Sequence, residues 1–278
     1  MKPFSLRSLS LACAGVVLTA ALPAAEPAII AKARAYLGAE DVLNNVKSLR
    51  FTGTLTTVDS ADPTKEIKST VELTIVAPDF QRITATTNKP DGTGKIVEST
   101  ALDSYEAWTK VQDTSAADAW RMNLLQPDQV RQLRANTWQS LNYYRGIEKI
   151  GGRIEDKGVV TADGVACHKI AFIHSPQIVF YRYFEVATGR LVLTETETGA
   201  TMRETGETIV AGIRFPKTLV TTAKFADRSR VITLNYDQVF VNETIPPSTF
   251  SVPMPVPTPV ARPLVPPRST LPPAPPKK

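Results

Sequence analysis

Residues Gln177 to Glu185 read QIVFYRYFE, at the centre of a segment from Arg153 to Val241 that decides the fold. Turn signals divide this segment at nearly regular intervals, where glycine can take positive φ, proline fixes φ or aspartate bonds its own backbone. The signals are Asp163-Gly164, Ser175-Pro176, Thr188-Gly189, Gly199-Ala200, Ala211-Gly212 and Asp227-Arg228. They leave seven candidate strands of about eight to thirteen residues, a spacing typical of an all-β sandwich or barrel.

The residues between these turns are strong β formers. Val231 to Val241 alternates, with Ile232, Leu234, Tyr236 and Phe240 predicted on one face. No helix of useful length fits within the segment. We therefore predict an antiparallel meander that buries one face.

A first group of about five strands precedes this meander. Leu49, Phe51 and Leu55 alternate with polar residues, which is the pattern of a half-buried strand. Val71, Leu73 and Ile75 repeat the pattern. Three more candidate strands follow at Gln81–Thr87, Gly94–Ser99 and Tyr105–Lys110.

Two helical regions accompany the strands. Pro27–Leu37 places Ile29, Ile30, Ala33 and Leu37 near one face, has Gly38 as its C-cap, and is followed by a shorter piece over Ala39–Val46. The second helix, at residues 128–144, lies in the only long interruption of the β pattern, Ser115–Tyr144. Twelve strands approach the upper limit for an open twisted sheet, so we expect curling and a concave apolar face, which only these helices can cover.

The chain begins with the features of a secretory signal. Lys2 and Arg7 form a positive start, Leu9–Leu22 is mostly apolar, and Pro23-Ala24-Ala25 offers a cleavage site, so residues 1–25 are excluded from the fold. A lipid anchor at Cys13 is disfavoured, because the apolar run continues past it and Ser10 stands where a lipobox has leucine. The mature chain then holds only Cys167 and forms no internal disulfide. We expect secretion across the inner membrane into the periplasm.

The charge and the proline content set the C-terminal end apart. Thirteen of the 22 prolines lie from Pro246 onward, and residues 253–278 are predicted to form a disordered, basic, polyproline-like tail. The formal net charge is +5; removing two cations of the leader and four that follow Ile245 leaves −1 for residues 26–245. This near-neutral domain, predicted over residues 26–252, offers no nucleic-acid surface.

Three stretches resemble the Lol-type outer-membrane lipoprotein-sorting proteins. The stretch from Tyr36 to Thr54 is similar to their opening, Tyr183–Leu191 to their central hairpin, and Tyr236–Pro253 to their ending. The resemblance covers about residues 28–253. It implies a mainly β (α+β) fold of LolA/LolB type, an unclosed antiparallel half-barrel covered by helices that holds acyl chains in an apolar cavity. With our own strand pattern, eleven to twelve strands are expected.

The sequence contains little that indicates chemistry. His168 and His174 share a face of a predicted strand but lie about 20 Å apart, too far for one metal ion, and Cys167 points to the opposite face. No hydrolase, metalloprotease or nucleotide-binding motif occurs. We predict no enzyme, no metal and no cofactor.

The candidate ligand-binding residues are the alternating apolar sets and one tryptophan. They permit two interpretations, a filled core and a lined cavity for an acyl chain, because cores and pockets use the same residue types. Trp108, Trp120 and Trp138 are packing residues first, and Trp138 on the predicted covering helix is the one expected to contact a ligand. The candidates are Leu49, Phe51, Leu55, Val71, Leu73, Ile75, Trp138, Ile232, Leu234 and Tyr236.

The leading hypothesis is a periplasmic, non-enzymatic protein that binds or carries a lipid or the acyl chains of a lipoprotein. The alternative is an envelope interaction module in which the half-barrel is a platform and the proline-rich tail docks to a protein partner. The tail also fits a plain solvated spacer.

Overall fold

The computed structural model describes residues 26–116 and 118–253. The predicted leader and most of the predicted tail, residues 254–278, lie outside them. The helices are α1 (Ala28–Leu37), α2 (Glu40–Asn44), α3 (Pro127–Leu141) and the 3₁₀ turns η1 (Ile147–Ile150) and η2 (Pro247–Thr249). The strands are β1 (Ser48–Asp59), β2 (Asp62–Val76), β3 (Phe80–Asn88), β4 (Lys95–Asp103), β5 (Glu106–Asp113), β6 (Trp120–Leu124), β7 (Arg153–Ala162), β8 (Val165–Ser175), β9 (Ile178–Glu185), β10 (Leu191–Thr196), β11 (Thr201–Val210), β12 (Ile213–Lys224) and β13 (Ser229–Val241).

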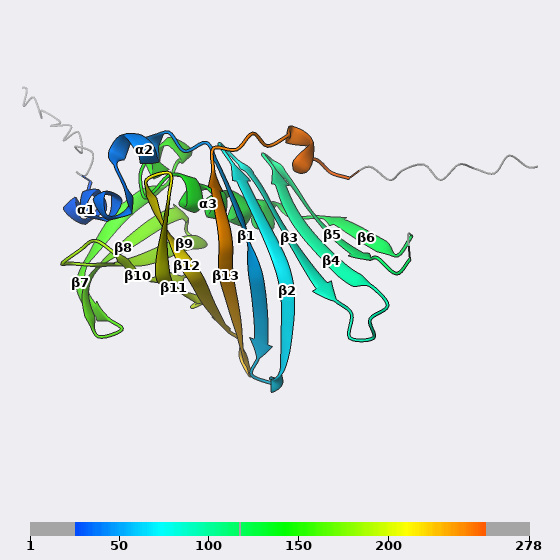
Figure 1. Cartoon of the computed structure of the whole chain (residues 1–278). Helices are drawn as coiled ribbons and strands as arrows, with labels where there is room; N and C mark the ends of the chain where they lie inside the picture. Colours follow the sequence, from blue (N-terminus) through cyan, green and yellow to red (C-terminus); the bar gives the residue numbers. More distant parts are fainter. Residues whose placement is uncertain (1–25, 117, 254–278) are drawn as a thin grey trace, which may run out of the picture. The chain divides into compact units, whose positions relative to one another are not determined.

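The fold is mainly β, as predicted. The strand order is β6-β5-β4-β3-β2-β1-β13-β12-β11-β10-β9-β8-β7, an antiparallel sheet that does not close because β6 and β7 stand at its two ends (Figure 1). The sequence predicts eleven to twelve strands, and the sheet has thirteen; the additional strand is β6. This strand lies inside Ser115–Tyr144, the stretch in which the sequence pattern of strands is interrupted.

All six turn signals of the central segment fall at the boundaries between consecutive strands, with Ser175 as the last residue of β8. Two of them form two-residue hairpin loops in which both residues have positive φ. Asp163 and Gly164 have φ of 47° and 78°, and Ala211 and Gly212 have φ of 51° and 80°. Such turns match the right-handed twist of antiparallel strands, so the local sequence directly specifies the meander.

The chain divides into two compact units. The first unit is formed by the residues up to Asn44 together with Asn142–Ala226, and the second by Asn45–Leu141 together with the residues from Asp227 onward. The first holds α1, α2, η1 and β7–β12. The second holds α3, η2, β1–β6 and β13.

In the first unit, α1 packs against β12 through its apolar residues. Ile30 and Ala33 are almost fully buried, whereas Leu37, predicted on the same face, is only half-buried. Gly38 stands at the C-cap as predicted, but its φ of 168° is extended, so positive φ is not the reason for glycine. A Cβ there would lie 2.6 Å from the Gly212 carbonyl oxygen, so only glycine lets the helix end meet the β11–β12 turn.

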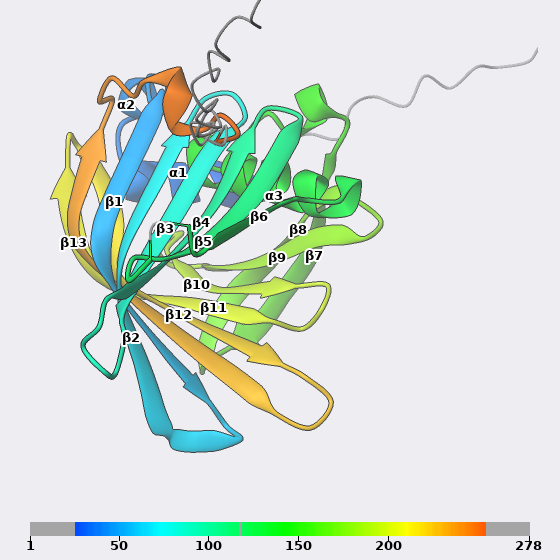
Figure 2. The same ribbon diagram turned by 90° about the vertical axis from the view of Figure 1, so that its right-hand side faces the viewer.

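In the second unit, β1 lies between β2 and β13. β3 pairs with β2 only from Ser69 onward, so the β1–β2 hairpin extends beyond β3 (Figure 2). A β-bulge interrupts the β1–β13 register between Thr52 and Gly53. A Cβ on Gly53 would lie 2.0 Å from the Asn235 carbonyl oxygen, so the bulge requires glycine.

The segment after β13 is anchored on the same unit. Phe250 is 2% exposed, and its ring lies 5.5 Å from that of Phe80. Its carbonyl oxygen accepts a hydrogen bond of 2.8 Å from Trp108 Nε1, and Arg82 Nη1 donates to the Thr249 carbonyl oxygen at 3.1 Å. The described chain is therefore fixed to β3 and β5 close to the point where the predicted tail begins.

Candidate functional site

Nine of the predicted site residues share one face of the second unit. Leu49 pairs with Ile75 and Phe51 with Leu73 across β1 and β2, and Leu55 pairs with Leu234 across β1 and β13. Gly53 faces Val71 on one side and Tyr236 on the other, and Ile232 follows two residues from Leu234. We call this set the apolar face: Leu49, Phe51, Leu55, Val71, Leu73, Ile75, Ile232, Leu234 and Tyr236.

One further residue predicted on this face lies elsewhere. Phe240 pairs with Arg50, which points to the opposite side of β1 from Leu49 and Phe51. The bulge at Gly53 inserts one residue into β13 and so reverses its alternation beyond that point. Arg50 covers the Phe240 ring at 3.9 Å, and Val239 takes the position on the apolar face.

The apolar face is buried unevenly. Leu49 and Ile75 are 2% and 1% exposed, whereas Leu55, Leu73, Ile232 and Tyr236 stay half-buried. Helix α3 explains the difference, because it lies against β2, β3 and β4. Its Thr137 hydroxyl donates to Gln81 Oε1 at 3.1 Å, and Gln81 is the β3 partner of Ile75. The covering helix therefore seals the Leu49 end of the face, and the second unit leaves the Leu55 end partly accessible.

The three tryptophans have three different roles. Trp138 lies on α3 and is 5% exposed. Trp108 is 1% exposed on the opposite side of the sheet, where it binds the Phe250 carbonyl. Trp120 was predicted to pack, but it is 38% exposed at the edge strand β6, where Lys110 covers its ring at 5.4 Å. Edge strands leave one side unpaired, which explains its exposure.

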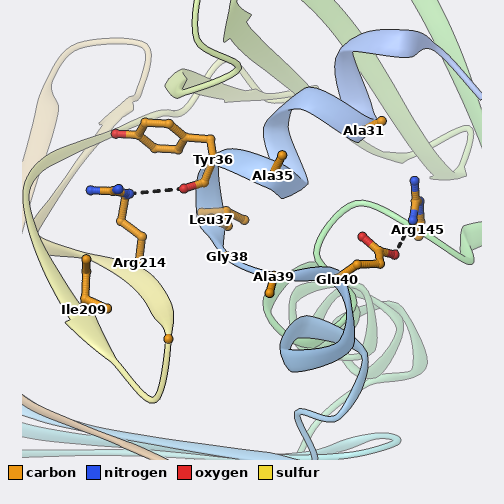
Figure 3. Close-up of a pocket in the computed structure, with 11 residues that line it drawn as sticks. Ala31, Ala35, Tyr36, Leu37, Gly38, Ala39, Glu40, Arg145, Ile209 and Arg214 are labelled. Atoms are coloured by element: carbon orange, nitrogen blue, oxygen red, sulfur yellow. Dashed lines mark hydrogen bonds and ion pairs between the residues drawn. The ribbon is translucent and has the colours of Figure 1, made fainter.

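The first unit contains a pocket of about 620 Å³ between the end of α1 and the β11–β12 hairpin (Figure 3). Apolar residues form much of its wall, among them Ala31, Ala35 and Ile209. Arg214 covers the Tyr36 ring at 4.8 Å, donates to the Tyr36 carbonyl oxygen at 3.2 Å, and pairs with Glu207.

The charges around this pocket are already paired. Burial, and then a hydrogen bond to the Glu207 carboxylate, raises the pKa of Tyr36 to about 12. Arg145 pairs with Glu26 and Glu40. Among the described residues, the pocket thus offers a small apolar surface and two arginines, Arg145 and Arg214, that are already paired with carboxylates.

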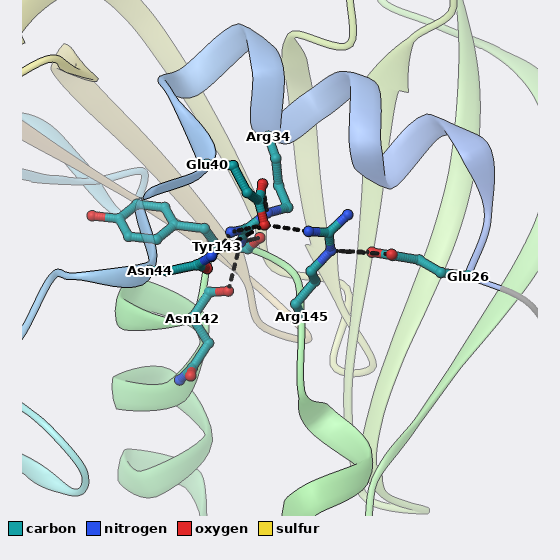
Figure 4. A network of polar contacts seen from close by, with 7 residues as sticks. All are labelled: Glu26, Arg34, Glu40, Asn44, Asn142, Tyr143 and Arg145. Carbon is teal, nitrogen blue, oxygen red and sulfur yellow. Dashed lines mark hydrogen bonds and ion pairs between the residues drawn. The ribbon is translucent and has the colours of Figure 1, made fainter. Parts of the chain in front are cut away.

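Arg34 is the centre of a polar network that the sequence did not predict (Figure 4). The residue is 2% exposed although it lies on α1. Its guanidinium donates to both Glu40 carboxylate oxygens at 2.9 Å and to Asn44 Oδ1 at 2.7 Å. It also donates to the carbonyl oxygens of Tyr143 at 2.7 Å and Asn142 at 3.3 Å. These bonds tie α1 and α2 to the chain that follows residue 141.

The electrostatics of this network agree with its geometry. The hydrogen bond from Arg34 holds the pKa of Glu40 below its ordinary value. A buried guanidinium is costly unless its donors are used, and here they bind a carboxylate, an amide and two carbonyls. Arg34 therefore fixes the two helices of the first unit to residues 142–143.

The residues with metal-binding or nucleophilic potential that the sequence analysis named all lie on β8. His168 and His174 share one face of β8, and Cys167 is buried on the other. His168 Nδ1 lies 3.6 Å from Asp156 Oδ2, and the His174 ring stands edge-on to Phe180 at 5.7 Å. In the part of the chain that the structure describes, no group of three or more histidine, cysteine or acidic side chains is arranged to hold a metal ion.

Solved structures define the class of fold. It is the fold of LolA superfamily proteins and outer-membrane lipoprotein-sorting domains, which confirms the resemblance inferred from the sequence at the level of fold. No protein-family model matches the chain, and no curated protein matches it by sequence. Within residues 26–116 and 118–253, no helix is long and apolar enough to span a membrane.

Three particular structures support this assignment. A LolA superfamily protein from Nitrosomonas europaea superposes with a TM-score of 0.51 at 10% identity, over 78% of this chain and 98% of that protein. A putative outer-membrane lipoprotein-sorting domain from Vibrio parahaemolyticus gives 0.50 at 10% identity, over 80% and 94%. A DUF1329 family protein from Desulfovibrio piger gives 0.51 at 7% identity, over 81% and 96%.

Proposed function

We propose that this protein binds a lipid or acyl chain non-covalently and carries it without performing chemistry. The observation that carries the proposal is the apolar face, whose Leu55, Leu73, Ile232 and Tyr236 keep accessible surface although they lie among buried neighbours. Apolar surface of this kind, continuous over three strands, is expected where a protein meets an apolar ligand.

The energetics of the proposal are favourable for a linear alkyl chain. Each CH₂ group removed from water contributes about 0.8 kcal/mol, so a chain of modest length repays the loss of its own freedom. The face offers branched aliphatic and aromatic side chains without charged groups among its nine members. Such a lining favours a chain over a polar solute.

The setting of the proposal is the periplasm, reached through the predicted leader in residues 1–25. Two of the structures with the same fold are a LolA superfamily protein and a lipoprotein-sorting domain. We therefore include the acyl chains of a lipoprotein among the cargoes that this protein would carry. The candidate contacts are the nine residues of the apolar face, with Trp138 from α3.

A matched pair of substitutions tests the proposed site. Leu55 lies on the apolar face, and its neighbour Thr54 points to the opposite side of β1, paired with Asn235 and Thr70. We expect Leu55→Asn to weaken binding of a fluorescent fatty acid at least about tenfold, since a buried leucine contributes about 1.5–3 kcal/mol and 1.4 kcal/mol is tenfold. Thr54→Asn should change binding by less than about twofold.

The comparison controls for the poor β propensity of asparagine, which both variants share. Displacement titrations with folded variants supply the readout. Equal losses in the two variants would place the ligand elsewhere. A wild-type protein that takes up no fatty acid would refute the function itself.

A further inference from the structure

A second arginine, Arg182, is half-buried on the first unit and differs from Arg34 in its surroundings. The register places it in one row with Ile170, Thr194 and Met202, on neighbouring strands β8, β10 and β11. Its neighbours on the same face of β9 are Phe180 and Phe184, which are 4% and 0% exposed. A cation therefore stands among apolar side chains.

Arg182 contacts two aromatic rings, and its side chain also hydrogen-bonds that of Tyr144. Its guanidinium carbon lies 4.7 Å from the centre of the Tyr144 ring and 5.6 Å from that of Phe172. Its Nε is buried and has no hydrogen-bond partner among the described residues. The described carboxylate whose charge acts on Arg182 is Glu204, whereas Arg34 makes a direct ion pair with Glu40. The hydrogen-bonding capacity of Arg182 is thus incompletely used.

The titratable groups that face Arg182 are Glu204, His174 and Tyr144. Burial lowers the pKa of Arg182, and Tyr144 and Glu204 oppose this effect. Burial also raises the pKa of the Glu204 carboxyl. His174 adds no charge at neutral pH, because burial and then Arg182 lower its pKa to about 4. Burial raises the pKa of the remaining group, Tyr144, to about 12.

Arg182 is nevertheless not closed off, since the residue keeps part of its surface accessible. On β11 and β12, Arg182 has half-buried neighbours on its own face, the apolar Met202 and Leu219 and the acidic Glu204. Met202 is in its row, and Leu219 pairs with Glu204 two residues along. A group that approaches Arg182 therefore meets a cationic fork with apolar contacts next to it. This combination suits a ligand that is charged at one end and apolar beyond it.

We propose that Arg182 binds the anionic head, a carboxylate or phosphate, of an amphipathic ligand whose adjoining carbon chain contacts Met202 and Leu219. The guanidinium fork matches two oxygens of such a head, and hydrogen bonds to charged groups are the strong ones in a desolvated place. The proposal rests on the proposed function only for the class of ligand, an acyl-chain compound; the anionic head and its adjoining chain contacts are assigned within the first unit. A neutral ligand of equal chain length would leave the N–H donors of the Arg182 guanidinium without an anionic acceptor.

The test compares hexadecanoic acid with hexadecan-1-ol, which differ in the head alone, as displacers of a neutral apolar dye from the full chain at pH 8. We expect the wild-type protein to bind the acid at least about tenfold more tightly, and Arg182→Gln to remove this preference while alcohol binding changes by less than about twofold. Arg182→Lys should keep part of the preference, since it retains charge without the fork. Arg203→Gln is the control, because Arg203 already pairs with Asp163.

The outcomes separate the two proposals. Equal wild-type binding of acid and alcohol would overturn the role of Arg182 while leaving acyl-chain binding intact, and this comparison needs no variant to fold. An Arg182→Gln variant that lost acid and alcohol equally would make Arg182 a structural residue. Acetate that competed in the low-millimolar range would assign the site to free anions. Binding of neither long-chain compound would refute both proposals.

Discussion

Replacing Arg34 with methionine is expected to destabilise the protein by about 3 kcal/mol, because breaking a buried charge network by removing one partner leaves the other groups without theirs. The carbonyl oxygens of Asn142 and Tyr143 lose their donor, and each unsatisfied buried group costs about 1–3 kcal/mol. Glu40 is 51% exposed and recovers water, which holds the expected loss to the lower end of the range. Urea unfolding measures the difference as a shift of the midpoint at unchanged slope.

Arg203→Met provides the matched control for this prediction. Arg203 pairs with Asp163 at 2.7 Å, but both side chains are 42% exposed, and exposed pairs contribute at most about 1 kcal/mol. If Arg34→Met lost no more stability than Arg203→Met, the hydrogen bonds of Arg34 would not hold α1 and α2 in place.

Phe250→Ala is expected to cost about 3–5 kcal/mol, the range for deleting a buried phenylalanine ring. The ring is 2% exposed, packs against Phe80, and lies next to the carbonyl that Trp108 binds. The loss should be accompanied by release of the segment after β13, which limited proteolysis would detect as cleavage between Pro246 and Pro253.

Exposed Phe225 serves as the control for the second prediction. It is 50% exposed, so Phe225→Ala should change stability by less than about 0.5 kcal/mol, as surface substitutions usually do. A stable Phe250→Ala variant, with the segment still resistant to protease, would show that the anchoring of residues 246–253 does not depend on this ring.

The sequence predicts the strands well where turns and alternation agree. Every turn signal between Arg153 and Val241 separates two strands, because glycine, proline and aspartate act through local backbone geometry. The alternation of β1 and β2 likewise placed Leu49, Phe51, Val71 and Ile75 on one face, because the side-chain period of a strand is two.

The features that the sequence did not predict depend on contacts between remote residues. Strand β6 has an almost wholly exposed pattern, since an edge strand can be held by backbone hydrogen bonds to β5 without an apolar face. From the sequence, an arginine such as Arg34 is expected on the solvent side of a helix. It is buried here because the carbonyl oxygens of residues 142–143 accept its hydrogen bonds. The bulge at Gly53 shifted Phe240 to the other side of the sheet, and no turn signal marks it.

The Arg182 site had a detectable signal. In QIVFYRYFE, the arginine shares its alternate positions with Phe180 and Phe184, so the alternation alone places a cation on an apolar face. The alternation does not predict the contact between Arg182 and the Tyr144 ring, because Tyr144 lies in the chain after α3. A charged residue at an apolar position of a buried strand is thus the sequence feature that most directly suggests a binding role.

The measurement that tests the central claim most directly is mass spectrometry of the protein purified from a periplasm without detergent, first in its native state and then after extraction with organic solvent. The account predicts a stoichiometric lipid, or a lipoprotein, that is released from the folded protein. An empty protein would contradict the account, provided that the same procedure recovers cargo from an established carrier.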